Sequence, residues 1–194
     1  LNGQMVKNME NKQAVLEIKT DRGTYILPAQ QINIDSISNQ LGKVVALQDI
    51  TIQIEIAVPT AGNMKKVADA AANGSFTLVA PPIDFIVRAT SSGVTVEVSK
   101  FNVYVERVIA LPEGVDPNKI TTGIVIDPDG TVRHVPTKVV VIDGKYYAKV
   151  NSLTNSTYSI VWHPLEFSDV SNHWAKAAVN DMGSRMVIEG TGNN

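Results

Sequence analysis

The chain has 194 residues, 17 Lys and Arg against 19 Asp and Glu, a formal charge of −2 and no cysteine. This length fits one domain, or one domain with a fragment of another. The near-neutral charge, without a Lys/Arg cluster, argues against nucleic acid as a partner. The lack of cysteine removes disulfides and thiol chemistry, and no apolar run is long enough to cross a membrane.

The composition favours strands over helices. The chain contains 26 Val and 18 Ile against only 9 Leu. Side chains branched at Cβ suit a pleated, half-buried surface. With 44% hydrophobic residues, the chain has enough apolar surface for a core. We therefore expect a mainly β, folded protein.

The expected elements alternate briefly between strand and helix and then become strands alone. In chain order they are strands at 15–18 and 24–27, a helix at 34–41, a strand at 50–56, a helix at 63–73, and strands at 75–80, 83–89, 94–98, 101–106, 123–126, 131–135, 138–142, 145–150 and 157–162. Asp35 is the expected N-cap of the first helix, which ends before Gly42. The strand at 50–56 shows isoleucine at every second position, which indicates one buried face.

Short turns rich in Gly and Asp separate these strands, as in Ser91-Ser92-Gly93, Asp127-Pro128-Asp129-Gly130 and Asp143-Gly144. Such residues tolerate the backbone conformations of tight hairpins. Turns at this spacing between short strands are typical of a sandwich or barrel. We therefore predict an antiparallel β-sandwich at 1–164, with its core at about 10–164 and one or two short helices.

Metal-binding patterns are weak in this sequence. The three histidines, His134, His163 and His173, have no second ligand at zinc-site spacing. The Asp-rich turns offer carboxylates that could hold calcium, if the turns meet at one end of the fold. The alternative is that these Asp residues are there to form turns, and this interpretation is favoured. We expect no cofactor, and we identify no catalytic or cofactor-binding residue.

Aromatic side chains fall in or near several predicted strands, namely Tyr104, Tyr146, Tyr147, Tyr158 and Trp162. Lined up on one sheet face, Tyr104, Tyr146, Tyr147 and Trp162 would form a platform for stacking sugar rings. Core or cross-strand packing is the commoner role for such residues. A carbohydrate-binding module, as found in polysaccharide-degrading enzymes, is therefore the alternative to a structural role.

The sequence changes character from Phe167 onward. Asp169 or Ser171 is placed to cap a helix that carries Trp174, Ala178, Val179 and Met182 at helical spacing.

The stretch from Phe167 to Val179, with Asp169-Val170 and His173-Trp174-Ala175, closely resembles the opening of a surface-layer homology (SLH) repeat. The segment 186–190, which ends at Gly190, fits the way such an opening closes. The chain lacks the Thr-Arg-Ala-Glu segment of a full repeat. The resemblance therefore implies a partial repeat at 165–194, with the matching residues mostly structural.

The body is similar to a β domain that often precedes SLH repeats, through Gly123–Val135, Asp143-Gly144-Lys145 and Ser156–Val161. These resemblances imply a secreted protein of the Gram-positive cell wall or S-layer. In such a protein the complete SLH region binds secondary cell-wall polysaccharide, and this partial repeat binds it weakly or not at all. We therefore expect a non-catalytic spacer or display module next to the anchoring region.

Overall fold

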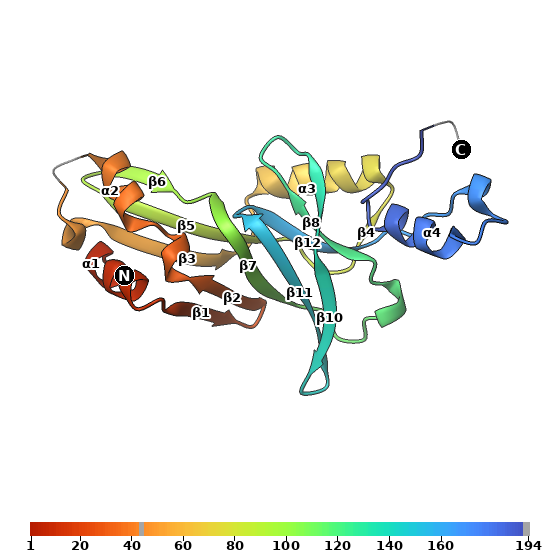
Figure 1. Cartoon of the computed structure of the whole chain (residues 1–194), viewed down its shortest axis with the longest axis horizontal. Coiled ribbons are helices and arrows are strands. Elements are labelled where there is room, and N and C mark those ends of the chain that lie inside the picture. The colour runs from red at the N-terminus through yellow and green to blue at the C-terminus, as the bar shows by residue number, and fades with distance from the viewer. Residues whose placement is uncertain (43–44, 192–194) are drawn as a thin grey trace.

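Two antiparallel β-sheets and four short α-helices form an elongated molecule (Figure 1). The structure is a computed structural model that describes residues 1–42 and 45–191. The prediction of a mainly β protein with antiparallel sheets is confirmed. Within the described residues, no helix has the length and apolar character needed to cross a lipid bilayer.

The first sheet has five strands, and its outermost strands are β1 and β10. Their order across the sheet is β1 (Val15–Thr20), β2 (Gly23–Pro28), β7 (Lys100–Ala110), β11 (Lys145–Thr154) and β10 (Thr137–Ile142). The two hairpins that this sheet contains, β1–β2 and β10–β11, lie where the strands at 15–18 and 24–27 and at 138–142 and 145–150 predict them. In the second hairpin the turn residues Asp143 and Gly144 have φ values of 50° and 77°, which Gly and Asp adopt readily.

The second sheet has seven strands. They are β3 (Thr51–Ala57), β5 (Ile83–Ser91), β12 (Thr157–Trp162), β8 (Thr122–Ile126) and β9 (Val132–Val135) in that order, with β4 (Thr77–Leu78) paired to β12 and β6 (Val94–Glu97) paired to β5. The predicted strand at 75–80 is shorter in the structure. Ser75 ends the preceding helix in a left-handed conformation, so the strand does not begin at this residue.

Side chains from both sheets share one hydrophobic core. Tyr25 and Val150 from the five-stranded sheet belong to the same buried cluster as Ile52, Phe85 and Ile160 from the seven-stranded sheet. The isoleucine alternation of β3 therefore indicated the buried face correctly at Ile52, which is 2% exposed. A smaller cluster lies between α3 and the outer side of the seven-stranded sheet.

The four α-helices are α1 (Gly3–Asn11), α2 (Ile34–Leu41), α3 (Ala61–Gly74) and α4 (Lys176–Ser184). Four single-turn 3-10 helices accompany them, η1 (Ala29–Gln31), η2 (Leu47–Asp49), η3 (Pro117–Lys119) and η4 (Ser168–Val170). The body up to residue 164 thus holds three α-helices rather than the expected one or two. Asn33, not Asp35, caps α2, because its side chain accepts a hydrogen bond from the Ser36 amide.

Helix α4 folds back on the residues that connect it to the body, and one of its contacts reaches His163 of the body. The Ser184 hydroxyl bonds both the amide and the carbonyl of Leu165, and Asn180 accepts a bond from the Phe167 amide. The ring of His163 bonds the Ser184 carbonyl at 2.8 Å. Residues 192–194 of the predicted partial repeat lie outside the described residues.

The predicted start of this last helix is wrong. Neither Asp169 nor Ser171 caps it, since α4 begins at Lys176 and its N-cap Ala175 makes no side-chain bond. Successive local turns, such as the bond from the His173 amide to the Val170 carbonyl, use the backbone groups of the preceding residues.

Candidate functional site: a polar cleft beside α3

One cavity of the described structure is an open cleft of about 480 Å³, lined in part by polar side chains. Its walls come from the first turn of α3, from the start of β5, from the β8–β9 turn and from the connection between β11 and β12. The cleft therefore gathers segments that lie far apart in the sequence. Thr60 fixes the first turn of α3, because its side chain accepts a hydrogen bond from the Asn63 amide.

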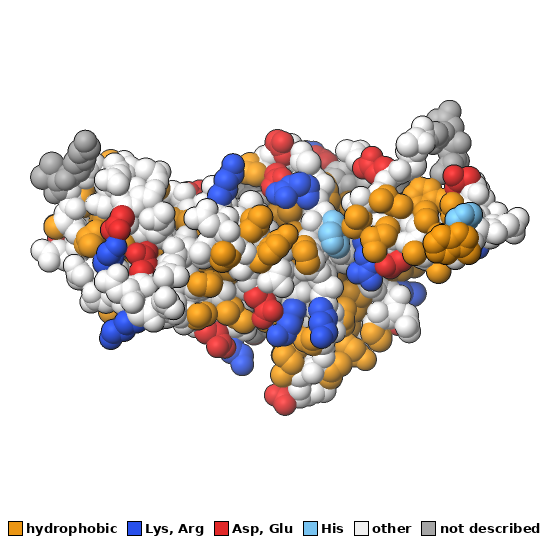
Figure 2. Space-filling model, viewed as in Figure 1, with side chains coloured by type: hydrophobic (Ala, Val, Ile, Leu, Met, Phe, Trp, Pro, Cys, Tyr) orange, Lys and Arg blue, Asp and Glu red, His pale blue; other side chains and the backbone are white. Residues whose placement is uncertain are grey.

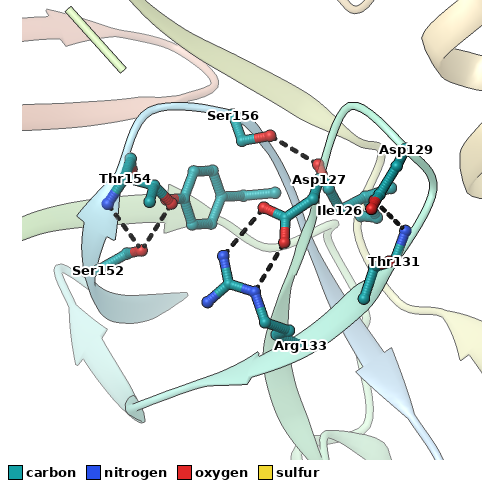
Figure 3. A network of polar contacts seen from close by, with 9 residues as sticks. Ile126, Asp127, Asp129, Thr131, Arg133, Ser152, Thr154 and Ser156 are labelled. Carbon is teal, nitrogen blue, oxygen red and sulfur yellow. Dashed lines mark hydrogen bonds and ion pairs between the residues drawn. The ribbon is translucent and has the colours of Figure 1, made fainter. Parts of the chain in front are cut away.

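The β8–β9 turn forms one wall and is stabilised by its own carboxylates (Figure 3). Asp127 receives two hydrogen bonds from Arg133, at 2.7 and 2.9 Å. Asp129 accepts a bond from the Thr131 amide at 2.9 Å, and this contact lowers the pKa of the Asp129 carboxyl. Both carboxylates thus act within the turn.

Asp84 lies on the floor of the cleft and is 7% exposed. One of its oxygens accepts a 2.6 Å hydrogen bond from the Thr157 hydroxyl. The two residues face each other across β5 and β12, so this contact joins the two strands. The neighbouring Ser156 hydroxyl donates to the Ile126 carbonyl at 2.6 Å (Figure 3).

Carboxylates outnumber cations around the cleft. The ionisable lining residues are Glu55, Asp84, Glu97 and Asp127 against Lys66 and Arg88. Lys66 donates to the Pro128 carbonyl at 2.5 Å, on the turn side. No histidine is among the lining residues that the structure describes. The cleft is thus rich in hydrogen-bond acceptors, and it suits polar ligands that carry donor groups.

Beneath this cleft lies a fully buried arginine, Arg107, which the sequence analysis did not single out. Its guanidinium donates to the carbonyls of Val105 and Thr154, both at 2.7 Å, and to the Asn155 side-chain oxygen at 3.0 Å. The pairing of β11 with β7 shifts register between Ser152 and Thr154, next to the Thr154 carbonyl that accepts from Arg107.

Aromatic rings enclose the same guanidinium. The rings of Tyr25, Phe85, Phe101 and Tyr158 have their centres 4.7–5.9 Å from its carbon atom. Tyr25 donates its hydroxyl to Asn155 at 2.6 Å, and burial raises the pKa of this tyrosine to about 12. Asn155 thus links the cage to the cleft that it also lines. In the strand predicted at 101–106, apolar residues occupy every second position up to Val105. Continuing this alternation by one step places Arg107 on the buried face.

The four candidate sugar-stacking residues lie in different surroundings. Tyr104 is 59% exposed, whereas Tyr146, Tyr147 and Trp162 are half-buried. Tyr146 packs against the shared core, and Lys119 covers the Trp162 ring at 5.6 Å. Tyr104 and Tyr147 lie on the outer face of the five-stranded sheet, on strands β7 and β11, but Tyr147 pairs with Ala110, six residues from Tyr104. The structure therefore does not bring the four rings together.

The residues that carry the SLH resemblance divide into a packed group and an exposed group. Phe167 is 7% exposed and packs on Gly183 of α4, while Val170 and Ala175 are half-buried. Asp169, His173 and Gly190 are exposed. Trp174 is 91% exposed and contacts the ring of His173, with the two ring centres 5.4 Å apart.

The Asp residues that were weighed as calcium ligands, and favoured as turn formers, lie in separate turns. Asp116 accepts a bond from the Asn118 amide in η3, and Asp143 occupies the β10–β11 turn. Within residues 1–42 and 45–191, no group of three or more His, Asp or Glu is placed to hold a metal ion.

The comparisons with known proteins found no match, whether to a family model, to a curated protein or to a solved structure.

Proposed function

We propose that the chain is a non-catalytic structural spacer of a secreted bacterial surface protein. In this proposal the two sheets form a β-sandwich, and residues 165–194 are the opening of an SLH repeat next to the wall-anchoring region. The protein resides in the cell wall or S-layer of a Gram-positive bacterium. Its polysaccharide partner is bound by complete repeats of the parent protein rather than by this segment.

The placement of the first and last helices supports this proposal most directly. Helices α1 and α4 lie at opposite ends of the elongated body (Figure 1). The N-terminal end is bonded to β3 of the seven-stranded sheet, and α4 is bonded to the residues that follow β12. The Leu1 amino group and the Ile52 amide exchange bonds with each other's carbonyls, and Ser184 bonds Leu165. An elongated body whose two ends are both bonded to the fold is suited to the role of a spacer.

The tail supports the second part of the proposal. Phe167 fills the space that a side chain at position 183 would occupy, which gives an apolar residue at the start of the motif a packing role. Trp174 projects with 91% of its surface exposed. An exposed tryptophan is unusual in a finished domain and suits a repeat whose other half would cover it.

Binding to purified secondary cell-wall polysaccharide tests the proposal. We expect co-sedimentation of the full chain with this polymer to stay at the level of a protein of similar charge that lacks SLH repeats. Strong, saturable retention would contradict a spacer role.

If retention occurs, two variants separate its causes. Loss with Tyr104→Ala would indicate sugar stacking on the outer sheet face, because this is the most exposed of the four candidate rings. Loss with Trp174→Ala would instead indicate binding through the SLH segment.

A further inference from the structure

Strand β10 presents an unpaired backbone edge. Within residues 1–42 and 45–191 its only partner strand is β11, and the two-residue turn Asp143-Gly144 makes Ile142 and Lys145 the closing pair of that hairpin. Because hydrogen bonding alternates along an antiparallel strand, Val139 and Val141 direct their N–H and C=O groups away from β11. Two hydrogen bonds agree with this alternation. The Tyr146 carbonyl, opposite Val141, accepts from the Leu111 amide at the end of β7 and so points away from β10. The Asn151 amide donates to the Pro136 carbonyl, just before β10. Among the described residues, neither Val139 nor Val141 makes another backbone hydrogen bond.

The other outer strands carry features that limit pairing. Glu17 and Lys19 place charges within β1, and β9 is only four residues long and includes Arg133. On β3, the Ile52 amide donates to the Leu1 carbonyl, so the N-terminus covers part of that edge. Charged residues, short length and coverage are the usual protections of an edge strand.

Strand β10 has few of these protections. Four consecutive apolar residues branched at Cβ run from Val139 to Ile142, and no proline or bulge interrupts them. Val141 is 58% exposed and Ile142 is 44% exposed. The hairpin projects from the body (Figure 1), and Figure 2 shows hydrophobic side chains gathered on its projecting end. The edge therefore has the room and the chemistry to accept another extended strand.

We propose that β10 pairs with β10 of a second copy of this chain, antiparallel and centred on Val140. The strand carries Lys138 near its start and is followed by Asp143 at its end. Antiparallel pairing brings Lys138 of one copy next to the Ile142–Asp143 end of the other. Parallel pairing would place like charges side by side, which is unfavourable. Charge complementarity thus favours a second copy in the antiparallel orientation.

This register satisfies the free backbone groups. Val139 of one copy faces Val141 of the other, and both residues direct their N–H and C=O groups to the shared edge. Val140 then lies opposite its own symmetry mate as a non-hydrogen-bonded pair, where Cα atoms are about 4.5 Å apart. The result is a two-fold interface that joins the two five-stranded sheets edge to edge.

The solution mass tests the pairing. In sedimentation experiments on the full chain, we expect the average mass to rise with concentration from 20.9 kDa toward twice that value. Val141→Lys should keep the monomer mass at concentrations where the wild-type chain is largely dimeric. Val15→Lys is the matched control, because Val15 is 57% exposed on the opposite outer strand of the same sheet. A monomeric wild-type chain, or equal loss of dimer in both variants, would overturn the proposal.

A crosslink tests the register without weakening the edge. The chain has no cysteine, so Val140→Cys introduces a single thiol. The expected spacing lies within the range of about 4.4–6.8 Å that disulfides bridge. Mild oxidation should convert this variant to a covalent dimer many times faster than Val94→Cys, whose position on β6 is 51% exposed. Equal rates for the two variants would contradict the proposed interface.

Discussion

The guanidinium carbon of Arg107 lies 4.7 Å from the centre of the Tyr158 ring, at a position without solvent exposure. Among the described ion pairs, none involves Arg107. Its charge is instead stabilised by neutral oxygens and by the faces of aromatic rings. Among the described residues the Nε atom has no hydrogen-bond partner, so the terminal nitrogens make all the hydrogen bonds of this guanidinium.

Arg107→Met should destabilise the fold strongly. It removes the hydrogen bonds that the guanidinium donates to Val105, Thr154 and Asn155, and hydrogen bonds from a charged group contribute about 1.5–3 kcal/mol each. The free energy of unfolding in denaturant measures the effect. Arg133→Met is the control, because its pair with Asp127 is partly exposed and such pairs contribute at most about 1 kcal/mol. Equal losses would show that the cage contributes no more than a surface ion pair.

Stability should fall in strong alkali through Tyr25. The folded protein holds the pKa of this buried tyrosine at about 12, above its ordinary value of 10.0. The neutral form is therefore favoured by folding, and this contribution is complete below pH 10 and is lost as pH rises from 10 to 12. Denaturant midpoints between pH 8 and pH 12 should decline less in Tyr25→Phe than in the wild-type chain. If the denaturant midpoints of Tyr25→Phe and of the wild-type chain decline equally, groups other than Tyr25 cause the loss of stability in alkali.

Gly183→Ala should release α4 from Phe167 and Leu165, which connect it to the body. A Cβ at this position would lie 2.3 Å from the Phe167 ring, which is itself buried. We expect faster proteolysis after residue 164, while the β-sheet circular dichroism stays unchanged. Gly62→Ala, in the first turn of α3, is the control, because its nearest neighbour would be 3.9 Å away. If Gly183→Ala is cleaved after residue 164 no faster than the wild-type chain, the contact between Phe167 and Gly183 does not keep α4 in place.

Docking of the tail should also weaken in mild acid. Burial, followed by the charge of Arg185, lowers the pKa of His134, whose ring bonds the Thr122 hydroxyl at 2.9 Å. The neutral ring is favoured in the folded state. Its contribution is present above the unfolded pKa of about 6.5 and is lost as pH falls through the folded value.

Hydrogen exchange of residues 176–184 at pH 5 and pH 7, corrected for the intrinsic rate, measures this docking. His134→Gln should remove most of the pH dependence. If His134→Gln keeps the pH dependence of exchange, a group other than His134 causes the weaker docking in mild acid.

Local patterns predicted the elements that depend on short-range chemistry. The turn at Ser92 and Gly93 has φ values of 49° and 79°, as a tight hairpin requires. Helix α2 ends at Gly42 as its sequence indicates. Helix α1 was not predicted, because its sequence is mostly polar and only Gly3 and Val6 are buried in it. The Asn2 side chain, which caps this helix, was the available signal.

The candidate site could not be predicted in the same way. The cleft places Asp84 beside Thr157, which is 73 residues away, through pairing that no local pattern encodes. Arg107 was missed because a charged residue on a strand is normally assigned to the solvated face. Trp174 was expected on a helix, but the turns around His173 place it before the helix begins.

The role of Asn155 has a consequence for producing this protein in eukaryotic cells. Asn155, Ser156 and Thr157 form an acceptor sequence for N-glycosylation. The amide nitrogen that would carry the sugar already donates to the Val98 carbonyl at 2.8 Å, and the oxygen of the same group binds Arg107 and Tyr25. A glycan at this nitrogen would require the cage to open. In a protein secreted from yeast or insect cells, the Asn155 side chain can therefore carry a glycan or make its contacts in the folded cage, but not both.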